Sequence, residues 1–277
     1  MDRVALDLGI VQIYWYSIFV FLGMLLGCAV IYKEAKKRNV SEDFLINLTF
    51  NALIFGIIGA RLYYVAFNLD YYLARPLEIL EIWNGGLAIH GGIFAGLLAT
   101  LAYCKSKKEN AMRMLDIIVV GVILGQAIGR WGNFFNQEAY GAITTLEALQ
   151  AQALPKFIID GMYILGEYRQ PTFLYESIGC LIGFIILILI RLKKTLKRGT
   201  LTASYLIIYG GLRFVIESMR SDSLMIGPLK IAQLVSICFI LIGVIILLLN
   251  LRKGKEDKYL YRKDPKEVAI EQIVYFN

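Results

Sequence analysis

The sequence has a single histidine, His90, and only four cysteines, which are scattered through apolar segments. One histidine cannot build a metal site. The cysteines form no CxxC pair and no other ligand spacing, so neither a metal centre nor a disulfide framework is expected. Charge is also scarce, since 18% of the 277 residues are charged and 58% are hydrophobic. That balance excludes an ordinary soluble domain.

Seven apolar runs are each long enough, at roughly 17–25 residues, to cross a bilayer as a helix. The sequence therefore predicts an all-α polytopic membrane protein with about seven transmembrane helices and a short extracytoplasmic loop region. Polar residues interrupt the second and fourth runs, which predicts tilted or partly unwound helices there. The predicted spans are 13–32, 44–67, 87–104, 116–135, 173–190, 201–219 and 229–250.

Lysine and arginine are divided unevenly between the segments that connect the spans. Twenty of the 29 fall in the segments 33–43, 105–115, 191–198 and 252–277. Only six fall in the alternate segments, 1–12, 68–86, 136–172 and 220–230. Basic loops stay in the cytoplasm, so we expect the amino terminus outside and the carboxyl terminus inside. The net charge of +7 fits basic loops beside anionic lipid and requires no nucleic acid.

This pattern predicts two parts of unequal size. Residues 1–251 form a membrane-embedded domain, and residues 252–277, which are mixed in charge and only weakly periodic, form a cytoplasmic tail.

Three arginines and two glutamates lie inside the predicted spans, where a charge near the bilayer centre costs at least about 2.5–3.5 kcal/mol. They are Arg61, Arg130, Glu176, Arg213 and Glu217. Such residues are functional candidates by default. Arg61 lies close to the end of its helix, so it has a second interpretation, in which its side chain reaches the membrane surface.

In the predicted orientation, the polar side chains of the spans gather at one depth. The arginines and Glu217 lie in the outer half of outward-running spans. Near the outer ends of inward-running spans lie Tyr14, Tyr16, His90, Tyr175 and Glu176. This arrangement predicts one polar cavity that opens outside the membrane or into its outer leaflet, and it argues against a pathway through the membrane.

Helical spacing brings several of these residues onto common faces. The segment YGGLRFVIESMR places on one helical stripe Tyr209, Arg213, Glu217 and Arg220. Within it, Arg213 and Glu217 are spaced to pair, which lowers the cost of burying either charge. The fourth span has a similar stripe of Gln126, Arg130, Asn133 and Gln137. Beside it runs a ridge that favours close helix packing, formed by Gly121, Gly125 and Gly129.

His90 lies in the segment NGGLAIHGGIFAG, residues 84–96. A lone histidine is more often a structural hydrogen-bonding residue than a catalyst. Here the glycines at 91 and 92 would let a ligand or another helix approach closely. A neutral imidazole, with an unperturbed pKa of about 6.5, would serve as a general base at this depth.

The stretch GRWGNFFNQEAYG, residues 129–141, resembles the signature of the prolipoprotein diacylglyceryl transferase family. The matching positions are Gly129, Arg130, Gly132, Asn133, Phe134, Asn136, Glu138 and Gly141. Other segments resemble further blocks of the family in the expected order. They are YWY (14–16), GARLYYVAF (59–67), IHGG (89–92), QPTFLYES (170–177) and YGGLRFVIESMR (209–220). Tyr14 and Gln170 stand where histidine is frequent in the family, so neither position is expected to be an indispensable base.

The resemblance implies an enzyme of the bacterial cytoplasmic (inner) membrane with its active site toward the extracytoplasmic side. Its reaction would transfer the sn-1,2-diacylglyceryl group of phosphatidylglycerol to the lipobox cysteine of an exported prolipoprotein signal peptide. The products would be a thioether and glycerol phosphate, in the first step of lipoprotein maturation. The buried arginines suit this donor, because a guanidinium holds a phosphate with two parallel hydrogen bonds. No metal or organic cofactor is implied.

The family match and the intramembrane charges together suggest a role for each residue. Arg130 is expected to bind the donor phosphate, Arg213 to stabilise the leaving group, and His90 to activate the thiol, although an arginine-assisted thiolate without a base is the alternative. Headgroup binding and cavity shape are expected of Tyr16, Asn133, Asn136, Glu138 and Tyr209. Supporting positions are Gly141, which would permit the turn after the signature, and Glu217, Arg220, Arg61, Tyr175 and Glu176.

Two other classes of membrane protein use polar residues inside the bilayer. A small-molecule transporter usually has internal repeats and polar residues near the midplane, and neither pattern occurs here. A serine-type intramembrane protease needs a nucleophile paired with a base, and no GxSx motif lies near His90. A liposome flux assay would identify a transporter.

The charge distribution makes a direct prediction of topology. Cysteines introduced into the 68–86 and 136–172 segments should react with an impermeant thiol reagent in intact cells, because both segments are expected outside. Labelling of 191–198 instead would invert the orientation and place the polar cavity on the cytoplasmic side.

Overall fold

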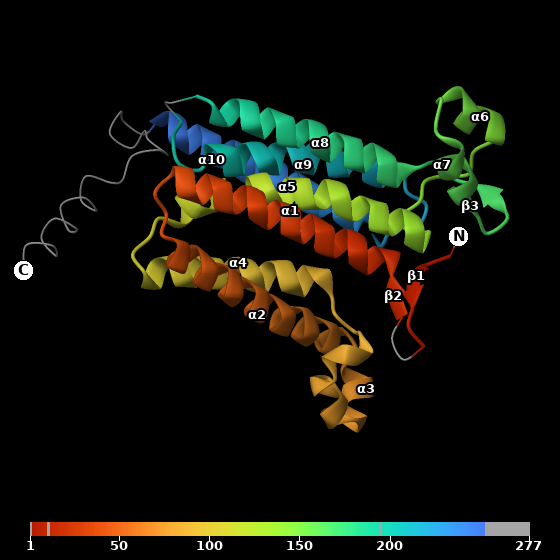
Figure 1. Ribbon diagram of the computed structural model, residues 1–277, viewed down its shortest axis with the longest axis horizontal. Helices are drawn as coiled ribbons and strands as arrows, with labels where there is room; N and C mark the ends of the chain where they lie inside the picture. Colours follow the sequence, from red (N-terminus) through yellow and green to blue (C-terminus); the bar gives the residue numbers. More distant parts are fainter. Residues whose placement is uncertain (1, 10–11, 194–195, 253–277) are drawn as a thin grey trace, which may run out of the picture. The chain divides into compact units, whose positions relative to one another are not determined.

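A computed structural model describes residues 2–9, 12–193 and 196–252, so nearly all of the predicted tail lies outside the described residues. The protein is mostly helical (Figure 1). The predicted spans coincide with the long helices α1 (Trp15–Lys37), α2 (Glu42–Phe67), α4 (Ile89–Ser106), α5 (Ala111–Asn136), α8 (Thr172–Arg191), α9 (Thr200–Met219) and α10 (Ile231–Arg252).

The helix limits differ most from the predicted spans at two places. Helix α1 continues to residue 37 rather than 32, through the mostly charged segment 33–37, and α5 begins at 111 rather than 116, so that it includes Arg113. Helices α2 and α5 are also continuous, so the unwinding predicted for the second and fourth spans is not found.

Five of the helices are long and apolar enough to cross a membrane, namely α1, α2, α5, α8 and α10. The chain is thus a multi-pass membrane protein. Helices α4 and α9 are less apolar, since α9 includes the Arg213 and Glu217 stripe and α4 includes His90 and Lys105. Crossing by all seven helices, and the direction of each, stay predictions.

The chain divides into two compact units, residues 1–34 with 115–277 and residues 35–114. We call them the first and the second unit and describe each separately. The core of the first unit is formed by apolar residues of α5, α8 and α9, among them Val120, Ile123, Leu187 and Leu201, each fully buried.

Helices α5 and α9 lie side by side in a defined register. The amide of Gln126 donates to the Tyr205 hydroxyl at 3.1 Å, and the Arg130 guanidinium donates to the Tyr209 hydroxyl at 3.4 Å. Both pairs are separated by 79 residues. Because one turn of α5 thus corresponds to one turn of α9, the two helices run parallel, and their predicted polar stripes face each other.

A buried carboxylate fixes the start of α9. Asp116 of α5 is fully buried and accepts hydrogen bonds from the Gly199 amide at 2.6 Å and the Thr202 amide at 2.7 Å. It also accepts from the Thr202 hydroxyl at 2.7 Å. A carboxylate at a helix N-terminus satisfies free backbone N–H groups and complements the helix dipole. The α5 sequence therefore determines where α9 begins.

Helix α1 packs against α5 through small residues. A Cβ added at Gly23 would lie 2.8 Å from the Gly125 carbonyl oxygen, and one at Gly27 would lie 2.8 Å from that of Gly121. Two members of the predicted glycine ridge therefore serve close packing, as predicted. The third, Gly129, has no atom within 4 Å of such a Cβ, so the prediction was wrong there.

Residues 137–171, which link α5 to α8, form a small folded head. It contains α6 (Leu146–Ala151), α7 (Lys156–Gly161) and an antiparallel hairpin of β3 (Tyr163–Ile164) and β4 (Glu167–Tyr168). Its core includes Leu149, Ile158 and Met162 and continues onto Phe134 and Phe173 at the ends of α5 and α8. The loop region is thus short, as expected, and it has its own hydrophobic core.

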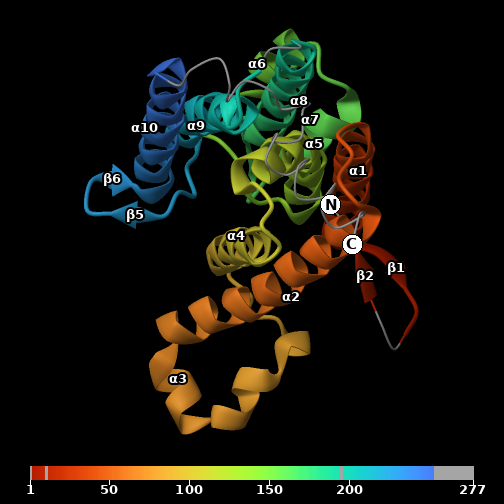
Figure 2. The same cartoon turned by 90° about the vertical axis from the view of Figure 1, so that its left-hand side faces the viewer.

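Two further hairpins belong to the first unit. Strands β1 (Val4–Asp7) and β2 (Gln12–Tyr14) pair antiparallel directly before α1. Strands β5 (Met225–Ile226) and β6 (Leu229–Lys230) pair between α9 and α10, as Figure 2 shows.

The second unit is built on α2 and α4, which pack through glycines. A Cβ at Gly92 would lie 3.3 Å from the Gly56 carbonyl oxygen, and Gly91 faces Gly59 and Tyr63. Of the two uses considered for the glycines at 91 and 92, close approach of another helix is therefore the one found. The α2–α4 connection contains α3 (Leu69–Ala74) and two short 3₁₀ turns (Pro76–Leu80 and Ile82–Asn84).

Arg61 holds this connection in place. It is 6% exposed, and its guanidinium donates to the carbonyl oxygens of Glu78 at 2.5 Å, Ile79 at 2.8 Å and Gly85 at 2.8 Å. It also lies over the Tyr72 ring, 5.1 Å from the centroid. These contacts are those of a structural residue, and the place of the side chain relative to the membrane surface stays a prediction.

Arg61→Lys tests this structural role. A lysine ammonium cannot reach all the carbonyl groups that Nε, Nη1 and Nη2 of the guanidinium bind along its edges, so the 76–88 backbone should open more often. We expect hydrogen exchange there to quicken by at least about tenfold, the equivalent of one lost charged hydrogen bond, with α5, α8 and α9 unchanged. Unaltered exchange in 76–88 would contradict the role.

Candidate functional site

A single buried carboxylate joins three helices of the first unit. Glu176 of α8 is 2% exposed. Its Oε1 lies 2.8 Å from Nη2 of Arg130 on α5, and its Oε2 lies 3.1 Å from Nη1 of Arg213 on α9. Two guanidinium groups thus share one carboxylate. We call these three residues, with Glu217, the arginine cluster.

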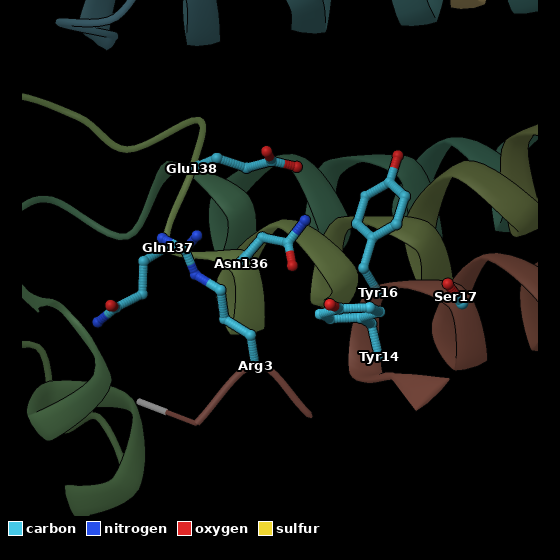
Figure 3. Close-up of a pocket in the computed structure, with 7 residues that line it drawn as sticks. All are labelled: Arg3, Tyr14, Tyr16, Ser17, Asn136, Gln137 and Glu138. Atoms are coloured by element: carbon cyan, nitrogen blue, oxygen red, sulfur yellow. The ribbon is translucent and has the colours of Figure 1, made fainter. Parts of the chain in front are cut away.

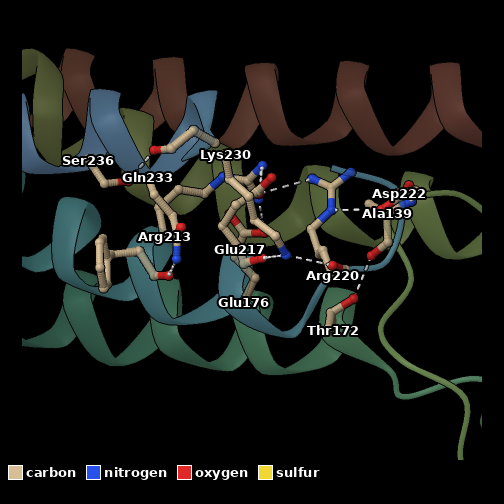
Figure 4. Close-up of polar contacts among 12 residues, drawn as sticks. Ala139, Thr172, Glu176, Arg213, Glu217, Arg220, Asp222, Lys230, Gln233 and Ser236 are labelled. Carbon is tan, nitrogen blue, oxygen red and sulfur yellow. Dashed lines mark hydrogen bonds and ion pairs between the residues drawn. The ribbon is translucent and has the colours of Figure 1, made fainter. Parts of the chain in front are cut away.

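The cluster continues along α9 as an alternation of charges (Figure 4). Nη2 of Arg213 lies 2.7 Å from Glu217, which is 2% exposed, so the predicted ion pair is confirmed. Glu217 also lies 3.6 Å from Arg220, whose Nε donates to Asp222 at 2.9 Å. Opposite charges at these distances offset much of the desolvation cost of burial.

Arg130 keeps hydrogen-bonding capacity beyond Glu176. Its Nη1 donates to Asn133 at 3.3 Å and its Nη2 to Tyr209 at 3.4 Å, both long bonds. Among the described residues, no acceptor binds Nε of Arg130 or of Arg213. A guanidinium has five N–H donors in one plane, so both arginines can bind a further oxygen-rich anion.

The turn after α5 is held in an unusual conformation. Gln137 and Ala139 have positive φ values, 53° and 58°, which non-glycine residues adopt rarely. The surrounding structure fixes the turn, because the Ala139 amide donates to Asp222 at 2.9 Å and its carbonyl accepts from Thr172 at 2.5 Å. As a result Glu138 turns back toward α5, where Asn133 donates to it at 2.7 Å.

Position 141 requires glycine for a different reason from the one expected. Its φ is not positive, so the turn itself does not demand glycine there. A Cβ at this position would instead lie 2.8 Å from Cβ of Gln170 and 3.0 Å from Cγ2 of Thr172. Glycine is required because the segment before α8 approaches residue 141 closely. The residues with strained backbone in this turn are Gln137 and Ala139.

A cavity of about 410 Å³ opens beside this turn (Figure 3). Its walls come from the first hairpin, the start of α1 and the end of α5. The lining residues are Arg3, Tyr14, Tyr16, Ser17, Asn136, Gln137 and Glu138. Glu138 links this wall to the arginine cluster through Asn133. We call this space the headgroup cavity, after the headgroup-binding role that the family resemblance implies for Tyr16, Asn136 and Glu138.

A second, apolar cavity of about 220 Å³ is formed by residues of α1, α5 and α8. It is lined by Phe19, Ala127, Ile128, Trp131, Ser177 and Leu181. Ser177 is not a free polar group, because its hydroxyl donates to the Ala127 carbonyl at 2.8 Å. Trp131 and Ser177 directly follow Arg130 and Glu176 in the chain, so the apolar cavity adjoins the arginine cluster. We call it the apolar groove.

The structure brings together most of the predicted site residues, namely Arg130, Asn133, Glu138, Glu176, Tyr209, Arg213, Glu217 and Arg220, with Tyr16 and Asn136 on the cavity wall. Tyr175 instead donates to Gln152 of the head at 2.7 Å. His90 is exposed at the second residue of α4, with the Tyr63 ring 6.4 Å away, and belongs to the second unit, as does Arg61.

Three residues beside the site were not predicted from the sequence. Arg3 lines the headgroup cavity, Asp222 joins Arg220 to the turn after α5, and Lys230 donates to the carbonyl oxygens of Glu217 at 2.7 Å and Arg220 at 2.8 Å. A signal existed for Asp222, which follows the Arg220 stripe by two residues. Arg3 and Lys230 lie in short hairpins, and no pattern distinguishes them from ordinary loop charges.

Comparison with known proteins gives a consistent result. Residues 3–249 match the family model described as prolipoprotein diacylglyceryl transferase. A phosphatidylglycerol–prolipoprotein diacylglyceryl transferase of Bacillus cytotoxicus is 44% identical over 95% of this chain and 97% of its own. Similar proteins of that name occur in Staphylococcus xylosus, 45% identical over 94% of this chain and 93% of its own, and in Lactococcus lactis subsp. cremoris, 45% identical over 89% and 93%.

Proposed function

The chain belongs to the prolipoprotein diacylglyceryl transferase family, and on that premise we propose that it transfers the sn-1,2-diacylglyceryl group of phosphatidylglycerol to a prolipoprotein cysteine. The protein is a transferase of the membrane. The donor is phosphatidylglycerol, and the acceptor is the lipobox cysteine in the signal peptide of an exported prolipoprotein. The products are a thioether and glycerol phosphate.

One observation carries the proposal, the sharing of the buried Glu176 carboxylate by Arg130 and Arg213. Glu176 and Glu217 match the two positive charges of the arginines, so the cluster carries no net formal charge, but its guanidiniums keep N–H donors that no described residue uses. A soluble anion would lose its hydration on entering a site among apolar helices, which costs free energy. An anionic lipid fits it, because its phosphate can reach the guanidinium groups while an acyl chain occupies the apolar groove.

The chemistry follows from this placement. The cysteine sulfur, as thiolate, attacks the diacylglyceryl carbon that is bonded to the phosphate oxygen. A sulfur–carbon bond forms, the carbon–oxygen bond breaks, and its electron pair stays on the phosphate. Negative charge therefore grows on the departing group, and guanidinium donors that are already oriented by Glu176 and Glu217 stabilise it without reorganisation.

The roles of the individual residues follow their positions. Arg130 is the main phosphate ligand, because Glu176, Asn133 and Tyr209 orient its guanidinium and no described residue accepts from its Nε. Arg213 stabilises the leaving group, and Glu176 and Glu217 position both guanidiniums. Thiol activation has two candidate agents, the His90 imidazole as a general base and the arginine pair stabilising the thiolate directly.

The membrane arrangement is part of the proposal. All seven long helices cross the bacterial cytoplasmic membrane, with the amino terminus outside, and the arginine cluster faces the extracytoplasmic side, where exported substrates arrive. The opposite end of the first unit has its own buried pair, Arg191 with Glu34. Residues 252–277 form a cytoplasmic tail.

Arg130→Lys separates phosphate binding from architecture. Lysine keeps one positive charge and loses the planar fork that binds two phosphate oxygens. We expect diacylglyceryl transfer to fall by about 10²–10³-fold, as for loss of one preorganised anion donor, while the protein accumulates in the membrane normally. Transfer is measured on a lipobox peptide with purified protein.

The matched control is Arg191→Lys, the same substitution in a similarly buried arginine that is also paired with a glutamate. It should keep most of the transfer activity. Near-normal activity of Arg130→Lys, or an equal loss of activity in both variants, would contradict phosphate binding by Arg130 and would indicate a structural role instead.

His90→Asn tests the general base. Asparagine keeps a polar side chain of similar reach and cannot titrate. A general base contributes roughly 10²–10⁴-fold, so the variant should be slow at neutral pH. Transfer should recover as the pH rises toward the free-thiol pKa of about 8.5, where solvent removes the proton. Binding of phosphatidylglycerol should be unchanged.

A pH profile parallel to that of the wild type would contradict the base assignment. Thiol activation would then belong to the arginine pair, and the transferase function itself would stand.

A further inference from the structure

Arg3 is the one charged residue of the headgroup cavity to which neither the sequence pattern nor the family signature assigns a role. It lies in the first hairpin, outside the predicted spans. Figure 3 shows its side chain extending from the hairpin toward Asn136 and Gln137. Among the described residues, its guanidinium has no ion pair and no hydrogen-bond partner. A cation without a partner among the described residues therefore belongs to the cavity lining, together with the Glu138 carboxylate.

The position of Arg3 is fixed although it lies near the chain end. The Trp15 amide donates to the Arg3 carbonyl at 3.1 Å, and the next residue, Val4, pairs with Tyr14 across the hairpin. Trp15 in turn stacks on Phe135 with 5.0 Å between ring centroids. Arg3 is thus attached to the contact between α1 and α5. Phe135, on the α5 side of that contact, directly precedes Asn136 of the cavity wall.

The charge balance of the proposed reaction requires a cation at such a place. Phosphatidylglycerol carries one negative charge as a phosphodiester, and the thiolate carries another. After the sulfur–carbon bond forms and the carbon–oxygen bond breaks, both charges reside on glycerol phosphate, a monoester dianion. Glu176 and Glu217 already match the two positive charges of Arg130 and Arg213, so the arginine cluster carries no net formal charge. The charge that the product gains is therefore not balanced inside the cluster.

We propose that the headgroup cavity is the leaving-group site, which receives glycerol phosphate, and that Arg3 binds its dianionic phosphate there. The proposal rests on the transferase function and names a subsite of it. Glycerol phosphate is small enough for a space of about 410 Å³. Its hydroxyl groups meet acceptors on the other wall, the free Glu138 oxygen and the Asn136 side chain.

The lining argues against the acceptor peptide as occupant. The part of a signal peptide that enters a membrane is apolar, whereas none of the seven lining residues is aliphatic. A phosphate with a polyol matches an arginine, a carboxylate, two amides and three hydroxyl groups. The link Arg130–Asn133–Glu138, with contacts of 3.3 and 2.7 Å, leads from the arginine cluster directly to this wall.

The test is product inhibition and binding with the full-length protein in phosphatidylglycerol-containing nanodiscs. Transfer to a lipobox peptide is measured against added glycerol phosphate for the wild type, Arg3→Gln and Arg3→Lys. The control is Lys156→Gln, which removes one exposed positive charge from the head of the same unit. Binding of glycerol phosphate, inorganic phosphate and glycerol is measured separately by calorimetry.

We expect Arg3→Gln to raise the glycerol phosphate inhibition constant and dissociation constant by about tenfold or more, the effect of one charged hydrogen bond. Arg3→Lys should recover part of the loss, and Lys156→Gln should change neither constant. The KM for the peptide should be unchanged in all variants. Glycerol phosphate should bind more tightly than inorganic phosphate or glycerol alone.

Three results would overturn the proposal: unchanged constants in Arg3→Gln, an equal rise in Lys156→Gln, or a raised peptide KM in Arg3→Gln, which would assign the cavity to the acceptor. In each case wild-type transfer would leave the transferase function standing. Absence of transfer by the wild type would contradict that function and this subsite together.

Discussion

The buried Glu176 carboxylate is the constraint on which the first unit depends. It forms ion pairs with Arg130 of α5 and Arg213 of α9, so three helices meet at one anion inside an apolar core. Removing one partner of such a buried pair costs about 3–5 kcal/mol, because an uncompensated charge remains. The same arrangement orients two guanidiniums with donors to spare. Stability and anion binding therefore have a common origin, and Glu176, expected only to support the site, lies at its centre.

The surrounding fold serves to place these three residues. Asp116 fixes the first turn of α9, and the equal spacing of the Gln126–Tyr205 and Arg130–Tyr209 contacts sets α9 in register with α5. Glycines let α1 approach α5 closely, which brings the first hairpin beside the end of α5. Rigid elements thus hold the cluster, as electrostatic preorganisation requires. Asn133 and Glu138 link the cluster to the headgroup cavity, and Trp131 and Ser177 of the apolar groove directly follow Arg130 and Glu176, a suitable arrangement for an amphiphilic donor.

Much of this was predictable from the sequence, and the failures have physical reasons. Apolar runs predicted the seven long helices, and helical spacing predicted the Arg213–Glu217 pair, because both patterns are local. The bridge by Glu176 joins residues 37 and 46 positions apart on different helices, which no periodicity reveals. Arg61 was misleading, because a charged residue near a helix end has the same pattern whether it binds a ligand or backbone carbonyls. The positive φ at Gln137 and Ala139 arises from tertiary contacts with Asp222 and Thr172.

The most direct test of the account is the mass of the product. Purified protein is incubated with phosphatidylglycerol of defined acyl chains and a peptide that contains a lipobox cysteine, and the peptide is then analysed by mass spectrometry. The account predicts a mass gain of one diacylglyceryl group on the cysteine, with a thioether that survives alkaline removal of the acyl chains. An unmodified peptide, or a single acyl chain held by an alkali-labile thioester, would contradict it.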